Sequence, residues 1–129
     1  MSPYNKYGNK KLDTPDGKFD SKYEYEEWCR LKLLERGHII SDLQRQVKLD
    51  LIPTIRTKKE TLQKIIYKAD FYYINEEGRK VIYESKGYKT KEYMIKKRLL
   101  IREYVIKNNF IFIESMKNKT TIYKKEDII

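Results

Sequence analysis

Two runs of aromatic and β-branched residues, joined by a short turn sequence, constrain the fold of this chain most strongly. The runs Ile65–Ile74 and Lys80–Lys86 are each typical of a β-strand. Asn75–Arg79 lies between them and suits a three-residue hairpin loop, a type I turn closed by Gly78 in the left-handed region. The first and last residues of this segment then pair across the base of the loop. The sequence therefore predicts a β-hairpin of fixed register.

That register gathers acidic and basic side chains on one face of the hairpin. Asp70 falls directly opposite Glu84, and like charges at that spacing destabilise a sheet unless something offsets them. Lys86 shares the face because strand side chains alternate, but a divalent cation is the more effective partner for two hard carboxylates. Lys68 falls opposite Lys86, which fits a site that receives phosphate unless strand twist or a bulge separates the two amines. The alternative is that both acids form ordinary ion pairs with these lysines.

The composition excludes several classes of protein. With 129 residues the chain has the size of one domain. No apolar run approaches the roughly 20 residues that span a bilayer, and the N-terminus lacks the apolar core of an export signal. A lone cysteine, Cys29, excludes an internal disulfide framework and a cysteine-based zinc site, so we expect a cytoplasmic protein. The lone histidine, His38, is expected to be a surface or capping residue.

The charge balance favours a polyanionic partner. Lysine and arginine number 29 against 19 acids, for a net charge of +10 and a pI near 9.5. The excess is concentrated in residues 53–68 and 86–107, although a lysine-rich surface also serves solubility alone. The candidate nucleic-acid contacts are Lys10, Lys11, Lys58, Lys59, Lys68, Lys89, Lys91, Lys96 and Lys97.

A first helix is predicted to begin at Ser21 and to end where Gly37 supplies a left-handed cap. Ser21 and Glu24 have the spacing of a capping box. Glu24 also shares a helical stripe with Trp28, which we expect to be a core residue. Glu24 is therefore expected near the buried side of the helix, where it is either a site residue or only the capping partner of Ser21.

The rest of the chain divides into a flexible basic arm, residues 1–18, and a single domain, residues 19–129. The domain is expected to contain a helix, three strands, a helix and a strand, with Gln46 on the polar face of its first strand. After the first helix come a strand over 43–52, a basic connection of undefined structure over 54–64, the hairpin, a helix from Thr90 to Lys107, a buried strand over 110–113 and a short edge strand over 120–123.

This order, with an acid on the second strand and an acid-x-lysine triplet on the third, resembles the PD-(D/E)XK nuclease superfamily. The matching residues are Ala69-Asp70 and Glu84-Ser85-Lys86. Ala69 stands where the motif has proline, and Ser85 stands where an apolar residue is more usual. Further segments look like a family of small phage-encoded, nuclease-like proteins related to Holliday junction resolvases and phage endonuclease I. They are Lys6–Lys11, Phe19–Glu24, Leu43–Gln46, Ala69–Phe71 and Lys86–Gly87.

The resemblance implies an α/β fold with a restriction-endonuclease-like αβββαβ core, a mixed four-stranded sheet flanked by helices. It implies a Mg²⁺- or Mn²⁺-dependent endonuclease that cuts DNA, plausibly branched recombination or replication intermediates, in the cytoplasm of the host cell. Because a resolvase needs two active sites on opposed strands, it also implies a homodimer.

The resemblance further assigns roles to individual residues. Asp70 and Glu84 would be metal ligands together with the main-chain carbonyl of Ser85, and Glu24 would be a further ligand, directly or through water. Lys86 would orient the attacking water or stabilise the charge that develops on phosphate. Gln46 matches a glutamine that many relatives place beside the site.

Two other classes of function stay open at this point. One is a catalytically inactive nuclease-fold protein that binds nucleic acid or regulates, and the other is a module that binds a partner protein. The first would bind DNA with a steep salt dependence but without a divalent-metal site. The second would need an exposed apolar patch.

Overall fold

A computed structural model describes residues 11–85 and 89–129. In chain order its elements are β1 (Leu12–Thr14), β2 (Gly17–Phe19), α1 (Lys22–Arg36), β3 (Ser41–Ile52), β4 (Ile55–Arg56), β5 (Thr61–Leu62), β6 (Ile65–Ile74), β7 (Lys80–Ser85), α2 (Lys91–Leu100), the π-helix η1 (Ile101–Ile106), β8 (Ile111–Met116), β9 (Lys119–Tyr123) and the 3-10 helix η2 (Lys125–Asp127).

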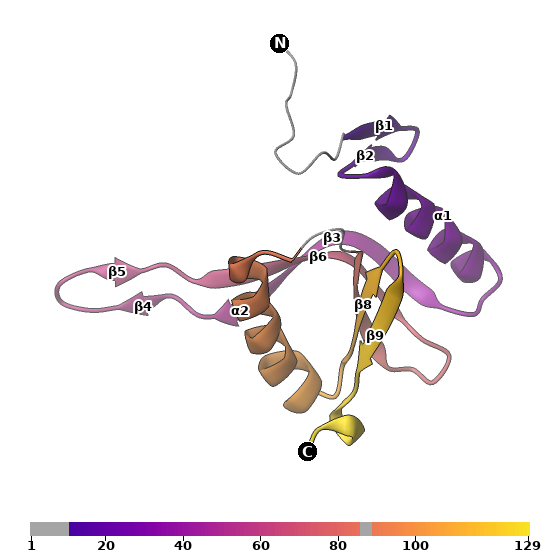
Figure 1. Ribbon diagram of the computed structural model, residues 1–129. Helices are drawn as coiled ribbons and strands as arrows, with labels where there is room; N and C mark the ends of the chain where they lie inside the picture. Colours follow the sequence, from indigo (N-terminus) through magenta and orange to yellow (C-terminus); the bar gives the residue numbers. More distant parts are fainter. Residues whose placement is uncertain (1–10, 86–88) are drawn as a thin grey trace, which may run out of the picture.

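A mixed five-stranded sheet, in the order β3-β6-β7-β8-β9, forms the centre of this α/β fold. Only the β7–β8 pair is parallel. Helix α1 and the α2–η1 segment lie on opposite faces of the sheet (Figure 1). Each helical layer covers its own apolar cluster, one around Leu31 and Phe71 and the other around Leu100 and Phe112. The four expected strands are present, and the predicted edge strand, β9, is the fifth.

The register of the β6–β7 hairpin confirms the predicted pairing from its loop as far as Phe71 and Tyr83, whereas the predicted pair of Asp70 and Glu84 is not part of the ladder. The Asn75 N–H donates to the Arg79 carbonyl at 2.9 Å, and Gly78 has a φ of +81°. The ladder runs up to the pair of Phe71 and Tyr83 and stops there. One residue further along each strand are the two acids of the candidate site, so the acids lie where backbone pairing gives way to side-chain contacts.

Strand β6 does not keep the simple alternation that the sequence suggests. Ala69 packs in the cluster beneath α2, whereas Phe71 packs in the cluster beneath α1. Asp70 lies between them, at the point where alternate side chains of the strand switch from one face of the sheet to the other. In the neighbouring strand β3, Gln46 has a φ of +56°, in the left-handed region that a non-glycine residue rarely adopts. The sheet is thus locally distorted beside the candidate site.

The end of α1 differs from the prediction in one residue. Gly37 has a φ of −83°, and His38 adopts the left-handed conformation with a φ of +62°. The His38 N–H donates to the Glu35 carbonyl at 3.0 Å, and the Ile39 N–H donates to the Leu34 carbonyl at 2.9 Å. These two bonds form a Schellman motif with His38 in the place that glycine usually takes. The left-handed cap at Gly37 was therefore wrong, and the capping role of His38 is confirmed.

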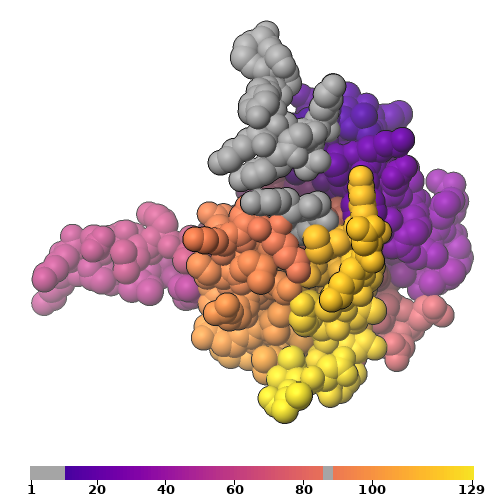
Figure 2. All heavy atoms as spheres, viewed as in Figure 1, coloured from indigo at the N-terminus to yellow at the C-terminus, as the bar shows by residue number. Residues whose placement is uncertain are grey.

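Two segments for which no strand had been predicted form β-hairpins. Part of the segment expected to be a flexible arm pairs as β1–β2, which leads into α1. The basic connection between β3 and β6 pairs as β4–β5, and it extends away from the body of the molecule (Figure 1). Figure 2 shows this hairpin standing clear of the rest of the surface. The predicted flexible arm was therefore wrong for the residues of β1 and β2, while no structure had been predicted for the basic connection.

The second helix begins at its predicted cap, since the Tyr93 N–H donates to the Thr90 hydroxyl at 3.0 Å. It changes from α-helix to π-helix after Leu100 and stays helical to Ile106. The predicted end of this helix near Lys107 is therefore confirmed, whereas the change of helix type was not predicted. No helix within residues 11–85 and 89–129 is long and apolar enough to cross a membrane.

Candidate functional site

The three acids expected at the site are all buried, and each comes from a different element. Glu24 on α1, Asp70 on β6 and Glu84 on β7 are 3%, 8% and 4% exposed. Acidic side chains are almost never this buried unless other groups partner them. The contacts of each carboxylate therefore define the site.

Glu24 joins the first turn of α1 to the polar side of β3. Its backbone N–H donates to the Ser21 hydroxyl at 3.0 Å, as the capping prediction requires. Its carboxylate accepts hydrogen bonds from the Asp20 N–H at 3.3 Å and from the Gln46 side-chain amide at 3.2 Å. Burial, and next to it the negative charge of Asp70, raise the pKa of Glu24 to about 7. Glu24 is thus both a capping residue and a member of a buried acidic cluster, beside Gln46 as expected.

Asp70 is held by the residue that departs from the motif. Its Oδ2 atom accepts hydrogen bonds from both the backbone N–H and the hydroxyl of Ser85, at 2.9 and 3.0 Å. An apolar residue in place of Ser85 would supply only the first of these bonds. The serine therefore fixes the position of Asp70 across the end of the β6–β7 ladder.

Glu84 accepts a hydrogen bond from a residue that the sequence analysis did not single out. The Tyr67 hydroxyl donates to its Oε1 atom at 2.8 Å, within the cluster beneath α2. Burial, and then the negative charge of Glu84, raise the pKa of Tyr67, so this phenol stays protonated and remains a donor. In the sequence, Tyr67 is one of several aromatic residues in its strand and carries no signal of this role.

A fourth buried acid, Glu114, lies beside Glu84 in the parallel register of β7 and β8. Its carboxylate accepts from the Tyr93 hydroxyl at 2.5 Å and forms ion pairs with Lys97 at 3.1 Å and Lys89 at 3.2 Å. Burial opposes ionisation of Glu114, but these three partners outweigh burial and lower its pKa. Because the buried strand was expected to end at residue 113, sequence analysis missed this acid.

A family model described as "Protein of unknown function (DUF1064)" matches residues 4–120, which is most of the chain. The chain belongs to the DUF1064 family. No curated protein matches its sequence significantly. One similar solved structure, "Crystal structure of SSO0001", shares 16% identity and a TM-score of 0.41 with the DUF1064 chain. The match covers 78% of the DUF1064 chain and 49% of the other chain, so this chain spans about half the length of that protein.

Most of the lysines expected to contact nucleic acid are exposed: Lys11, Lys58, Lys59, Lys68, Lys89 and Lys91. Lys11 forms an ion pair with Asp20 at 3.7 Å, Lys96 with Glu92 at 3.3 Å and Lys89 with Glu114. Lys10 and Lys86 lie outside the described residues. The predicted pairing of Lys68 with Lys86 therefore stays a prediction.

Lys97 is a correction to the sequence analysis. It is buried against Glu114, and its ammonium lies 4.8 Å from the centre of the Tyr123 ring. Burial opposes protonation, but hydrogen bonds to Tyr123 and Glu114 raise its pKa. Lys97 is therefore an interior cation that neutralises Glu114, not a surface contact for DNA.

The candidate ligands of the DUF1064 site are all hard oxygen donors, which suit Mg²⁺ or Mn²⁺ rather than zinc. Glu24, Asp70 and Glu84 supply carboxylates, and Ser85 supplies a main-chain carbonyl. Within residues 11–85 and 89–129, no group of three or more histidine, cysteine, aspartate or glutamate side chains is close enough to hold a metal ion. The donors are thus of the type that Mg²⁺ takes, but within the described residues the carboxylates do not form a ready-made ligand set.

Proposed function

We propose that this DUF1064 protein is a metal-dependent endonuclease that hydrolyses phosphodiester bonds in DNA. The observation that carries the proposal is the burial of Glu24, Asp70 and Glu84, from three separate elements, at the end of the β6–β7 ladder. Burying several carboxylates near one another is unfavourable unless charge is neutralised. A bound divalent cation would neutralise this charge and could also take part in hydrolysis.

The order of the elements supports a finer description of the fold. Helix α1, strands β3, β6 and β7, helix α2 and strand β8 follow one another in the αβββαβ order of a restriction-endonuclease-like core. In this proposal the β1–β2 and β4–β5 hairpins and strand β9 are additions to that core. The order fits the PD-(D/E)XK resemblance of the sequence.

The residues of the chain have distinct tasks in this proposal. Asp70 and Glu84, the Ser85 carbonyl and Glu24 would hold Mg²⁺ or Mn²⁺. Such an ion, when bound, generates a hydroxide nucleophile near neutral pH and neutralises charge on the phosphate. Lys86, immediately after Ser85, would orient the attacking water.

Three further contacts would keep the carboxylates in place. Gln46 donates to Glu24, the Ser85 N–H and hydroxyl donate to Asp70, and the Tyr67 hydroxyl donates to Glu84. Partners of this kind around a metal site orient the ligands and are often needed for tight binding. Each of the three acids thus has its own supporting donor.

The distribution of charge supports DNA as the substrate. The chain carries a net charge of +10. Because these acids are buried, the exterior is strongly basic. The β4–β5 hairpin adds exposed Arg56, Lys58 and Lys59 on a two-stranded ribbon, a shape that the major groove of DNA admits. Branched DNA and a homodimer with two opposed sites remain part of the proposal through the sequence resemblance.

The test is cleavage of supercoiled plasmid and of a four-way junction with Mg²⁺ or Mn²⁺. We expect the parent to cut, Asp70→Asn and Lys86→Ala to lose at least about a hundredfold in rate, and Asp50→Asn to behave like the parent. Asp50 is a matched control because it lies on β3 but is exposed and paired with Lys64 at 3.6 Å. If purified protein cuts neither substrate, or Asp70→Asn cuts as well as the parent, the proposal fails.

A second candidate is a DNA-binding protein without catalysis, which the exposed basic β4–β5 hairpin favours because that hairpin needs no acids. Calorimetry distinguishes the two. The second candidate predicts salt-dependent DNA binding and no Mn²⁺ binding that Glu84→Ala removes. The proposed nuclease predicts both.

A further inference from the structure

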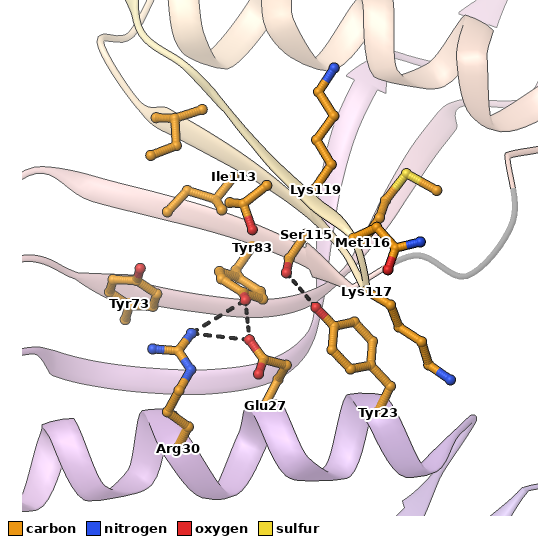
Figure 3. A pocket seen from close by; sticks show the side chains of 13 residues that line it. Tyr23, Glu27, Arg30, Tyr73, Tyr83, Ile113, Ser115, Met116, Lys117 and Lys119 are labelled. Atoms are coloured by element: carbon orange, nitrogen blue, oxygen red, sulfur yellow. Dashed lines mark hydrogen bonds and ion pairs between the residues drawn. The ribbon is translucent and has the colours of Figure 1, made fainter.

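An open pocket of about 550 Å³ lies between α1 and the β8–β9 hairpin, on the face of the sheet that α1 covers. We call it the side pocket. Figure 3 shows Tyr23, Glu27 and Arg30 projecting from α1 toward Tyr83 and Ser115 on the sheet. The volume is within the range of pockets that bind small molecules or single nucleotides.

The inner wall of the side pocket is a connected polar cluster. The Glu27 carboxylate accepts hydrogen bonds from the Tyr83 hydroxyl and from Arg30, the latter at 3.1 Å. Arg30 also donates to the Tyr83 hydroxyl at 3.3 Å, and the Tyr23 and Ser115 hydroxyls lie 2.5 Å apart. The wall therefore offers fixed hydrogen-bond acceptors and donors side by side, as recognition of a base edge requires.

The outer wall, from the β8–β9 hairpin, combines one exposed apolar side chain with polar and basic ones. Ile122 on β9 is 48% exposed, and it lines the pocket together with Lys117 and Lys119 from the β8–β9 hairpin. The Arg30 side chain is 49% exposed, so its guanidinium adds a further cation at the opening. The exposed Ile122 side chain, the polar inner surface and the cationic rim together match an aromatic ligand that carries a phosphate.

The side pocket is adjacent to the acids of the proposed active site. Tyr23 immediately precedes Glu24 on α1. Ser115 is the β8 partner of Ser85, whose hydroxyl contacts Asp70, and adjacent strands are only about 4.8 Å apart. A DNA strand with a phosphate at Asp70 would therefore have a neighbouring nucleotide within reach of the pocket.

We propose that the side pocket binds one unpaired nucleotide of the DNA strand, next to the phosphate at the proposed active site. The proposal rests on the proposed function and adds a class of substrate, DNA with an unpaired nucleotide beside the cut. A paired base stays in its stack, and taking it out costs energy that an unpaired base does not require. The pocket thus selects bulges, gaps and junctions over continuous duplex.

The test measures binding without cleavage, by fluorescence anisotropy of labelled duplexes in EDTA. One duplex is fully paired, one carries a single-nucleotide bulge, and one carries the same bulge without its base. We expect the parent to bind the bulged duplex about tenfold more tightly than the paired duplex, and the abasic bulge to lose this preference.

Ile122→Glu introduces a negative charge on the outer wall and should abolish the preference. The matched control is Ile95→Glu, because Ile95 is also exposed but lies on α2, on the other face of the sheet. Arg30→Met gives a second variant and should reduce the preference in the same direction. Circular dichroism checks the fold of each variant.

The proposal is overturned if the parent shows no preference for the bulged duplex, or if the abasic bulge binds as well as the complete one. It is also overturned if Ile122→Glu prefers the bulged duplex as strongly as the control Ile95→Glu does. A protein that prefers the bulge but never cuts DNA refutes the nuclease and leaves the side pocket in place. A protein that cuts DNA without this preference refutes the side pocket alone.

Discussion

Glu24, Asp70 and Glu84 are supported by neutral hydrogen-bond donors from three different elements. The donors are the amide of Gln46, the N–H and hydroxyl of Ser85, and the phenol of Tyr67. These donors fix the direction in which each carboxylate points. Donors of this kind around a metal site orient its ligands.

The raised pKa of Glu24 predicts a specific pH dependence of stability. Because its pKa is about 7 in the folded protein against 4.5 as its ordinary value, the folded state binds this proton more tightly than the unfolded chain. The resulting stabilisation is complete below about pH 4.5 and is lost as the pH rises through about 7. Glu24→Gln cannot ionise, so relative to the parent it should gain up to about 3 kcal/mol between pH 5 and pH 8.

Urea unfolding at a series of pH values, in metal-free buffer, measures this difference. Glu92→Gln, an exposed change on α2, is the control and should show no comparable trend. A gap between Glu24→Gln and the parent that stays constant from pH 5 to pH 8 would contradict the buried environment described for Glu24.

Tyr67→Phe removes a single hydroxyl beneath the site. The loss of its hydrogen bond to buried Glu84 should lower the free energy of unfolding by about 1 to 3 kcal/mol. It should also weaken Mn²⁺ binding by about 10- to 100-fold, measured by titration calorimetry. Tyr73→Phe is the control, because Tyr73 is buried in the cluster beneath α1. Equal Mn²⁺ affinities for the two variants would show that Tyr67 does not position Glu84.

The Schellman motif at the end of α1 makes a prediction for a single element. Because His38 has a φ of +62°, His38→Gly should raise the free energy of unfolding by about 0.5 to 1 kcal/mol. Gly37→Ala is a contrast, since Gly37 has a negative φ and an added Cβ would meet the Leu33 and Leu34 carbonyl oxygens at 3.5 and 3.8 Å, ordinary contact distances. Thermal unfolding of both variants measures the effect, and destabilisation by His38→Gly would contradict it.

The β4–β5 hairpin should contribute to DNA affinity without contributing to the fold. Replacing both Lys58 and Lys59 by glutamine should weaken binding to every DNA sequence and lower the slope of log K against log salt by about two. The double change of Lys124 and Lys125 to glutamine removes the same charge elsewhere on the molecule and is the control. Equal losses from the two double variants would mean that net charge, and not the hairpin, determines affinity.

Local signals explain why some elements could be predicted from the sequence. Gly78 specified the loop of the β6–β7 hairpin, and Ser21 and Thr90 specified the starts of the two helices. The β1–β2 and β4–β5 hairpins were missed because their two- and three-residue strands carry no hydrophobic alternation. Polar turn sequences of this kind look like irregular loops.

The residues of the candidate site that could be predicted are those that depend on patterns local in the sequence. Asp70 and Glu84 follow from the hairpin register, whereas Glu114 reaches Glu84 only through the parallel pairing of β7 and β8. Lys97 could have been identified as buried, since it lies four residues after Tyr93 and three before Leu100, on the apolar stripe of its helix. The basic excess over residues 86–107 led instead to the prediction that Lys97 contacts nucleic acid.

At the scale of the whole molecule, the charges are separated between interior and surface. Four acids, Glu24, Asp70, Glu84 and Glu114, are buried, while most described lysines are exposed. Within this group, Glu114 has Lys97 and Lys89 as cationic partners. The basic exterior can therefore attract a polyanion, while these acids are held in the interior.

An anomalous-scattering map from crystals soaked in Mn²⁺ tests the central claim most directly. We expect one strong peak in contact with the carboxylates of Asp70 and Glu84, and its loss in crystals of Asp70→Asn. No peak beside these acids, in crystals that diffract well and take up Mn²⁺ elsewhere, would contradict the account.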